Sequence, residues 1–223
     1  MFYSVEKNDH GLRYSPFKSC VVPRPIGWIS TRSKAGVTNL APYSLFNVLG
    51  FDPPYVMFSA SGHSKGGRKD SVVNAEETGE FVYNMATWDL RHAVVQTSEI
   101  IDFGIDEMAV AGLEPAPSML VKPLRVAASP ISFECKHYQT MVLPGTTPEN
   151  NNHVVIGRVV GVHINDEVIM PDGRVDILKI RPLSRLGYLD YATIDSIVEL
   201  RPSTLDARVL TAMSGGRGNQ STN

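Results

Sequence analysis

The sequence predicts a mainly β domain, a barrel or a sandwich, with two or three helices. Short runs of β-branched and aromatic residues recur along the chain, each bounded by Pro, Gly, Asn or Asp. Their number and irregular spacing are typical of a barrel or sandwich. The 223 residues, 43% hydrophobic and 20% charged, have ordinary globular usage. This composition excludes disordered, collagen-like and coiled-coil chains and favours one large domain.

Seven strands are expected from these runs. In chain order they cover residues 21–22, 27–30, 55–59, 80–86, 131–135, 154–164 and 177–180. Residues 144–152, with two prolines and a triple Asn, are expected to form a loop.

Three helices are expected between the strands. Asp70 can cap a first helix, which carries Val72, Val73 and Ala75 and stops at Gly79. Thr87 can cap a second helix over residues 88–101, and a third, short helix covers residues 107–110. The tail, residues 214–223, has no apolar residue, and its composition predicts disorder.

Composition and charge exclude several classes of protein. Lys and Arg number 21 against 23 Asp and Glu, a net charge of -2, so we expect no nucleic-acid partner. Residues 1–10 contain Glu6, Lys7 and Asp9 and lack the apolar core of a secretory signal. The longest uncharged stretch, residues 35–51, is too short and too polar to span a membrane. We therefore expect a cytoplasmic protein without a membrane anchor.

The cysteines and histidines predict neither a disulfide framework nor a metal site. Cys20 and Cys135 are expected to be buried small hydrophobes. The six histidines are scattered, and the pair Cys135 and His137 lacks two further ligands at zinc spacing.

The densest set of anion-binding features lies in residues 62–71, between an expected strand and an expected helix. Glycines, the cations Arg68 and Lys69 and the free amides of a helix N-terminus converge there, which favours a phosphate. A Walker loop is excluded, because Arg68 and Lys69 stand where that loop needs Lys and Ser or Thr. A solvated basic turn is the structural alternative.

Several uncommon motifs occur here in a specific order. Residues 23–31 (PRPIGWIST), 38–47 (TNLAPYSLFN) and 52–59 (DPPYVMFS) are followed by 68–71 (RKDS), Asn74 and the turn 79–81 (GEF). From about residue 16 to 201 the chain resembles the flavin reductase-like family of FMN-binding split barrels, in particular its flavoredoxin-like branch. The resemblance implies a six-stranded antiparallel Greek-key barrel with two or three peripheral helices over residues 16–205. Residues 1–15 are then an N-terminal extension, and residues 206–223 a C-terminal tail.

The resemblance also implies a cofactor, FMN rather than FAD, and the residues that hold it. The isoalloxazine and ribityl chain would lie against Ser30, Thr31, Asn39, Leu40, Ala41, Ser44, Phe46 and Asn47, and the phosphate against Ser59, Arg68, Lys69 and Ser71. Asp70 is assigned to helix capping, with its side chain turned away from the phosphate. Trp28 and Phe46 could instead fill the core. Arg185 or Tyr188 would contact the cofactor or a partner subunit.

The function implied is an FMN-binding oxidoreductase that passes hydride from NAD(P)H to flavin and electrons on to an unknown acceptor. The chain has no G-x-G-x-x-G fingerprint, so the nicotinamide would stack directly on the flavin. No general acid or base is required, and no catalytic residue is assigned. The resemblance further implies a homodimer. The alternatives are a flavoredoxin-type electron carrier serving a partner redox protein, without nicotinamide oxidation, and a non-flavin binder of phosphate ligands.

Overall fold

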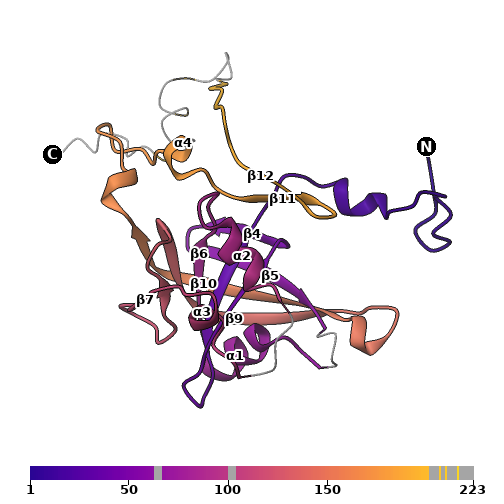
Figure 1. Ribbon diagram of the computed structural model, residues 1–223, viewed down its shortest axis with the longest axis horizontal. Coiled ribbons are helices and arrows are strands. Elements are labelled where there is room, and N and C mark those ends of the chain that lie inside the picture. Colours follow the sequence, from indigo (N-terminus) through magenta and orange to yellow (C-terminus); the bar gives the residue numbers. More distant parts are fainter. Residues whose placement is uncertain (63–66, 100–103, 201–205, 207–208, 210–214, 216–223) are drawn as a thin grey trace.

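A curled antiparallel sheet of seven strands forms the centre of the computed structural model (Figure 1). The structure describes residues 1–62, 67–99, 104–200, 206, 209 and 215. The strand order is β3-β2-β6-β9-β10-β5-β4. The predicted mainly β, antiparallel fold is confirmed. The main sheet has seven strands, whereas the family resemblance implied a barrel of six.

Twelve strands occur in the described part of the chain. Those of the main sheet are β2 (Gly27–Arg32), β3 (Thr38–Tyr43), β4 (Phe46–Phe51), β5 (Pro54–Ser61), β6 (Glu80–Met85), β9 (Ile131–Leu143) and β10 (Asn152–Ile164). A small sheet joins β1 (Arg24–Pro25), β11 (Ser184–Gly187) and β12 (Asp190–Ala192), and a two-stranded ribbon joins β7 (Pro115–Ala116) and β8 (Arg125–Val126).

Short helices connect and flank the strands. They are α1 (Asp70–Thr78), α2 (Arg91–Gln96), α3 (Glu107–Val110) and α4 (Ile177–Ile180), with single 3-10 turns η1 (Pro16–Ser19), η2 (Pro148–Asn150) and η3 (Asp166–Val168). None of the helices described is long and apolar enough to cross a membrane.

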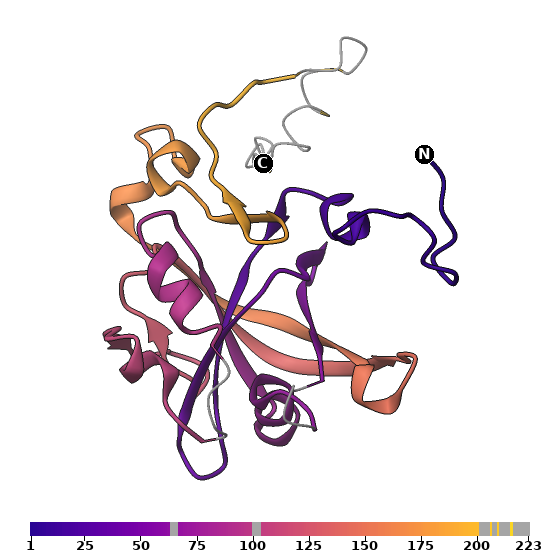
Figure 2. The same cartoon turned by 45° about the vertical axis from the view of Figure 1, so that its right-hand side comes forward.

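The main sheet has two edges, β3 and β4, which are not paired with each other. The Tyr43 ring of β3 packs on the Phe58 ring of β5, with centroids 4.9 Å apart. Figure 2 shows the sheet curling around its interior, while the long β9–β10 hairpin projects to one side. Side-chain packing, and not strand pairing, therefore connects β3 to the β4–β5 side of the sheet.

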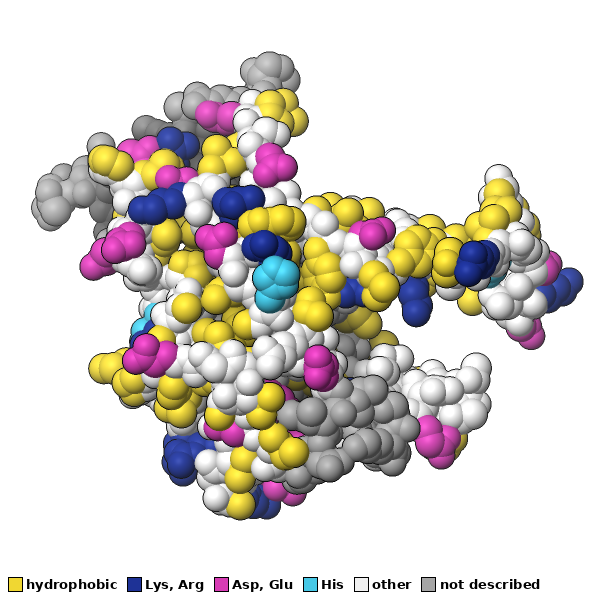
Figure 3. Space-filling view, viewed as in Figure 1, with side chains coloured by type: hydrophobic (Ala, Val, Ile, Leu, Met, Phe, Trp, Pro, Cys, Tyr) yellow, Lys and Arg dark blue, Asp and Glu magenta, His cyan; other side chains and the backbone are white. Residues whose placement is uncertain are grey.

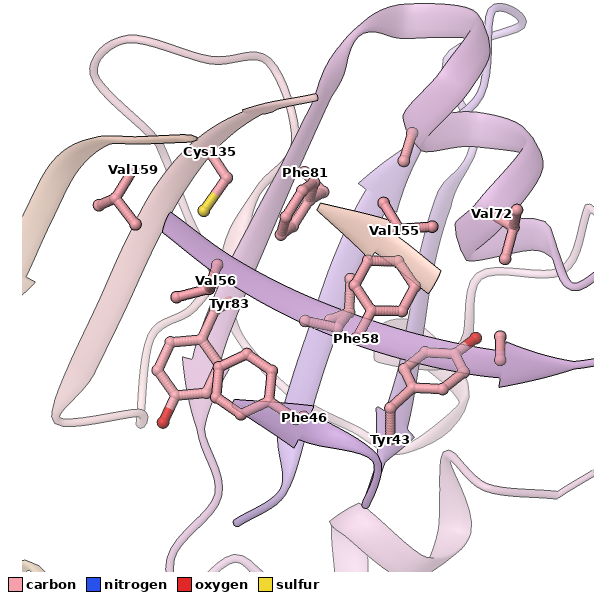
Figure 4. Close-up of a cluster of buried hydrophobic side chains, with 13 residues drawn as sticks. Tyr43, Phe46, Val56, Phe58, Val72, Phe81, Tyr83, Cys135, Val155 and Val159 are labelled. Carbon is pink, nitrogen blue, oxygen red and sulfur yellow. The ribbon is translucent and has the colours of Figure 1, made fainter. Parts of the chain in front are cut away.

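The main core fills the interior of the curled sheet (Figure 4). Alternate residues of β5, Val56, Phe58 and Ala60, point inward, as the two-residue period of a strand requires. Phe46 stacks on Tyr83 with centroids 4.6 Å apart and rings inclined by 11°. Full burial of such a side chain contributes about 1.5–3 kcal/mol.

A second core lies on the other face of β2. Trp28 is fully buried there, and its indole N–H donates to Thr97 Oγ1 at 2.9 Å. The alternative that placed Trp28 in the core is thus the one observed. The bond ties the end of α2 to the middle of the sheet.

Some expectations about the strands are wrong. Residues 177–180 form helix α4, because Asp176 caps it by accepting the Lys179 N–H at 3.0 Å and Arg181 ends it in the left-handed region. Residues 21–22 lie outside any strand, and β1 begins at Arg24. Strands β3 and β4 were missed, because Asn39, Pro42, Asn47 and Gly50 are typical of turns.

The helix expectations hold in part. Helix α1 ends as predicted at Gly79, whose φ is +74°, but its N-cap is Lys69 and Asp70 is already its first residue. Helix α3 covers the predicted residues. Helix α2 is much shorter than predicted, because it starts only after the turn at Trp88 and ends before Thr97. Residues 100–103 and most of the predicted tail lie outside the described residues.

The two cysteines differ in their surroundings. Cys135 is buried in the main core, as expected, and burial raises the pKa of its thiol. Cys20 is exposed, contrary to expectation, because its 3-10 turn packs no side chain into a core. Among the residues described, no group of His, Cys, Asp and Glu could hold a metal ion.

Candidate functional site

A polar pocket of about 90 Å³ lies where the edge strand β3 meets the first turn of α1. The end of α2 and the start of α3 close its other sides. Its walls are formed by Asn39, Ala41, Pro42, Tyr43, Lys69, Asp70, Thr97, Ser98, Glu99 and Glu107. The pocket therefore collects side chains from four separate elements of the chain.

A buried hydrogen-bond network forms the floor of the pocket around Asn39. In the amide orientation that satisfies all partners, the Asn39 oxygen accepts from Ser71 Oγ at 2.9 Å and from Thr31 Oγ1 at 3.3 Å, and its nitrogen donates to Glu107 Oε1 at 3.2 Å. Asn74 Nδ2 donates to Thr31 Oγ1 at 3.1 Å. Each hydroxyl in this network has a partner within the chain, so the network fixes the position of β3 against α1.

Glu107 is the most perturbed acid of the pocket. Its side chain is buried, and its Oε2 accepts the Leu40 N–H at 3.0 Å. Burial raises the pKa of Glu107 to about 7, against the opposing effect of the backbone hydrogen bonds, and the nearby charges of Asp70 and Asp106 raise it further. A carboxyl with a pKa well above that of an ordinary glutamate thus faces the pocket.

Glu107 was not predicted as a site residue, whereas Tyr43 belongs to the run 39–44 that was expected to line the flavin. Glu107 is separated from Asn39 by 68 positions, and a glutamate in the first turn of a short helix is otherwise typical of a favourable helix dipole. Burial raises the pKa of Tyr43, although a hydrogen bond with Ser71 lowers it.

Of the four predicted phosphate ligands, the structure places Lys69 on the pocket wall. Ser71 is buried in the network beneath it. Arg68 is ion-paired with Glu76 of α1. Ser59 pairs with Val154 on β10 and does not line the pocket. Four residues of the segment 62–71, namely 63–66, lie outside the described residues.

The predicted ring-contacting residues divide between the two faces of β2 and β3. Thr31, Asn39 and Ala41 lie at the pocket. Ser30 faces the opposite side of β2, where it donates to the Leu124 carbonyl at 2.5 Å. The Leu40 side chain belongs to the second core, so only its backbone N–H reaches the site through Glu107.

The remaining residues predicted to contact the flavin ring, Ser44, Phe46 and Asn47, lie in β4 or just before it. Ser44 is half-buried in the turn between β3 and β4. Phe46 is part of the main core, which was the alternative stated for it. Asn47 is exposed, and its carboxamide oxygen accepts the N–H of Val48 at 2.9 Å.

Arg185 and Tyr188 lie in the β11–β12 hairpin, outside this pocket. The Arg185 guanidinium lies over the Tyr191 ring, 4.4 Å from its centroid, and donates to the Tyr188 carbonyl. Tyr188 adopts a positive φ of +46° and packs its ring against Tyr14.

The donor set of the pocket fits a phosphate group, and its volume of about 90 Å³ is enough for that part of a flavin only. The Lys69 ammonium and the positive end of the α1 helix dipole favour a phosphate. Along β3, Asn39 and Ala41 line the same space. Asp70 and the ionised form of Glu107 add negative charge, so a phosphate would bind best on the Lys69 side of the pocket.

Comparisons with known proteins give a consistent result. The model of the flavin reductase like domain matches residues 19–178. An uncharacterized protein of Aquifex aeolicus is 36% identical over 187 residues, which cover 84% of this chain and 92% of that protein.

Solved structures are similar over almost the whole chain. Nitrilotriacetate monooxygenase component B from Bacillus cereus superposes with a TM-score of 0.82 at 29% identity, covering 90% of this chain and 98% of that one. The 2-nitrobenzoate 2-nitroreductase NbaA of Pseudomonas fluorescens gives 0.77 at 27% identity, with 93% and 99% coverage. Flavoredoxin of Desulfovibrio vulgaris (Miyazaki F), at 17% identity, a TM-score of 0.70 and 92% and 99% coverage, shares the fold.

Proposed function

Because this chain belongs to the flavin reductase like domain family, we propose that it is an FMN-dependent oxidoreductase which takes hydride from NADH or NADPH and passes electrons to an acceptor. The observation that carries the proposal is the pocket between β3 and α1, where Lys69, the first turn of α1 and Asn39 converge. The names of two similar structures, a monooxygenase component and a nitroreductase, support redox chemistry on this fold.

In this proposal the side chains of the protein bind and orient the cofactor. FMN, when bound, supplies the centre that accepts two electrons. Lys69 and the N-terminus of α1 would hold the phosphate, and the network around Asn39 keeps β3 at a fixed distance from them. No side chain has to move a proton for hydride transfer, so the chain contributes mainly by orientation.

We also propose that the protein is a homodimer. Exposed apolar side chains on the edge strand β4 support this, with Val48, Leu49 and Phe51 exposed by 41%, 53% and 88%. Light scattering of the FMN-loaded protein should then give twice the chain mass of 24.5 kDa. A stable FMN complex of one chain would contradict the dimer.

The first experiment is an anaerobic titration of the purified protein followed by visible absorbance. We expect the bands of oxidised flavin, either as purified or after addition of FMN, and their loss on addition of NADH or NADPH. Bound flavin that neither nicotinamide reduces would overturn the enzyme in favour of an electron carrier. A protein that does not retain added FMN would contradict the flavin site itself.

Replacing Lys69 with alanine should weaken FMN binding about tenfold or more and leave riboflavin binding nearly unchanged. The reason is that only FMN carries the phosphate that the ammonium would contact, and a charged hydrogen bond contributes about 1.5–3 kcal/mol. Flavin fluorescence quenching gives both affinities. Lys34→Ala, in the exposed β2–β3 turn, is the matched control. An equal loss for both flavins would disprove the assignment.

A further inference from the structure

A second pocket lies between α2 and the β11–β12 hairpin, and the proposed function does not use it. It has a volume of about 380 Å³, within the range of roughly 300–1,000 Å³ typical of small-molecule sites. Trp88, Arg91, His92, Val95, Leu189, Asp190 and Tyr191 line it. Most of this lining is apolar or aromatic, with a few charged groups.

Two aromatic rings form the fixed walls of this pocket. Trp88 and Tyr191 are half-buried, and both pack against the second core. Val95 and Leu189 add aliphatic surface and are 45% and 84% exposed. The pocket thus joins rigid aromatic walls to apolar side chains that remain in water, which is favourable for a flat apolar ligand.

Three guanidinium groups stack on these rings. Arg91 lies 4.7 Å and Arg181 5.5 Å from the centroid of the Trp88 ring, and Arg185 lies 4.4 Å from that of Tyr191. Arg91 Nη1 also donates to the Trp88 carbonyl at 2.7 Å, which fixes the orientation of its planar group.

The charge around the pocket is positive on balance. The acids nearby are Asp190, on the wall, and Asp89, which lies 3.9 Å from Arg181. Against these two carboxylates stand the three arginines. Figure 3 shows basic side chains and a histidine beside apolar side chains on the face over α2.

We propose that this pocket binds a planar aromatic molecule that carries a negative charge. Its ring would lie in the space lined by Trp88, Val95 and Tyr191, and its charged group would accept hydrogen bonds from Arg91. A stacked guanidinium keeps its N–H edge available for a carboxylate or phosphate, and this geometry suits bidentate recognition. An aromatic carboxylate and an adenine nucleotide share this chemistry.

The position of the pocket relates it to the flavin site. Arg91 begins α2, and Thr97, just past the end of α2, lines the first pocket. At about 1.5 Å per residue the two positions are separated by roughly 9 Å along the helix. A ligand in the second pocket would therefore lie beside the flavin pocket, although its binding does not depend on flavin chemistry.

Tryptophan fluorescence tests the proposal directly. The chain has two tryptophans, and Trp28 is fully buried, so Trp88 is the one that a ligand in this pocket can contact. The full chain, kept at one flavin loading throughout, is titrated with benzoate and with 5′-AMP, and separately with the uncharged analogues benzamide and adenosine. We expect saturable quenching by at least one anion, at least tenfold tighter than by its uncharged analogue.

Variants assign the binding to Arg91. Arg91→Ala should weaken binding of the anion about tenfold or more, while Arg32→Ala, at the exposed last residue of β2, should leave it unchanged. Arg91→Lys keeps the charge without the planar fork and should also lose most of the affinity, which keeps the test valid if the alanine variant misfolds. Benzoate alone would identify a carboxylate site, and AMP alone a nucleotide site. If neither anion quenches saturably, or if the uncharged analogues bind equally well, the proposal is wrong.

Discussion

Replacing Glu134 with alanine is expected to lower the free energy of unfolding by about 3–5 kcal/mol. The Glu134 side chain is fully buried in β9, yet it accepts the N–H groups of Met119, Leu120 and Val121 at 2.7, 2.5 and 3.1 Å. His163 Nε2 lies 2.5 Å from Glu134 Oε1, which also accepts the Met119 N–H. Without the carboxylate, three backbone donors and the imidazole lose their acceptor inside the protein, which is far more costly than the loss of one exposed ion pair.

Urea unfolding of the wild-type and variant proteins measures this effect. Glu134→Gln, which keeps the shape and one acceptor oxygen, should lose about half as much, and Glu114→Gln, at an exposed position, should lose almost nothing. Burial opposes ionisation of Glu134, but the hydrogen bonds from His163, Met119 and Leu120 outweigh it and lower its pKa. Its contribution is therefore present above the ordinary glutamate pKa and is lost as the pH falls through the lower, folded-state value. A loss below 1 kcal/mol for the alanine variant would contradict this account.

The stability of the wild-type protein is expected to decrease between pH 5 and pH 8.5, and replacing Glu107 with glutamine should make this decrease much smaller. The folded-state pKa of Glu107, about 7, lies above its usual value of 4.5. The native state therefore binds more protons than the unfolded state between these two values, and stability falls as the pH rises through this window. One pKa unit corresponds to about 1.4 kcal/mol, and solvent at the pocket mouth screens part of the effect, so we expect a difference of about 1–2 kcal/mol.

The measurement is urea unfolding of both proteins across this pH range. The difference between the two stability curves isolates Glu107, because the other titrating groups contribute to both. Glu77→Gln, which alters an exposed glutamate on α1 paired with Lys34 at 3.7 Å, should leave the pH profile unchanged. Parallel curves for wild type and Glu107→Gln would show that the carboxyl is not perturbed in this way.

Local sequence patterns were sufficient to predict the helices and strands whose residue propensities agree with their tertiary surroundings. Helix α1 has a glycine that can adopt the left-handed C-cap, and β2, β5, β6 and β10 have β-branched or aromatic runs. Strands β3 and β4 could not be read from propensity, because their turn-forming residues are held extended by pairing with β2 and β5. Residues 177–180 have a strand composition, but the Asp176 cap decides in favour of a helix.

The candidate site was predicted where it follows a continuous motif and missed where it depends on the tertiary fold. Asn39, Ala41 and Lys69 come from recognisable segments and do meet at one pocket. Glu107 joins them only because α3 packs on the edge of β3, a contact between distant segments. Ser30 and Thr31 are adjacent, yet the pleat of β2 sends them to opposite faces.

The unpaired edge of β3 has a consequence for aggregation. An exposed strand edge offers its N–H and C=O groups to a strand of another molecule, which is a route to intermolecular β-sheets. Here the Leu40 N–H is already bonded to Glu107, and Pro42 has no N–H to offer. The same glutamate that faces the pocket therefore also blocks the addition of a foreign strand, so partial unfolding that releases α3 would expose a template for fibril-like assembly.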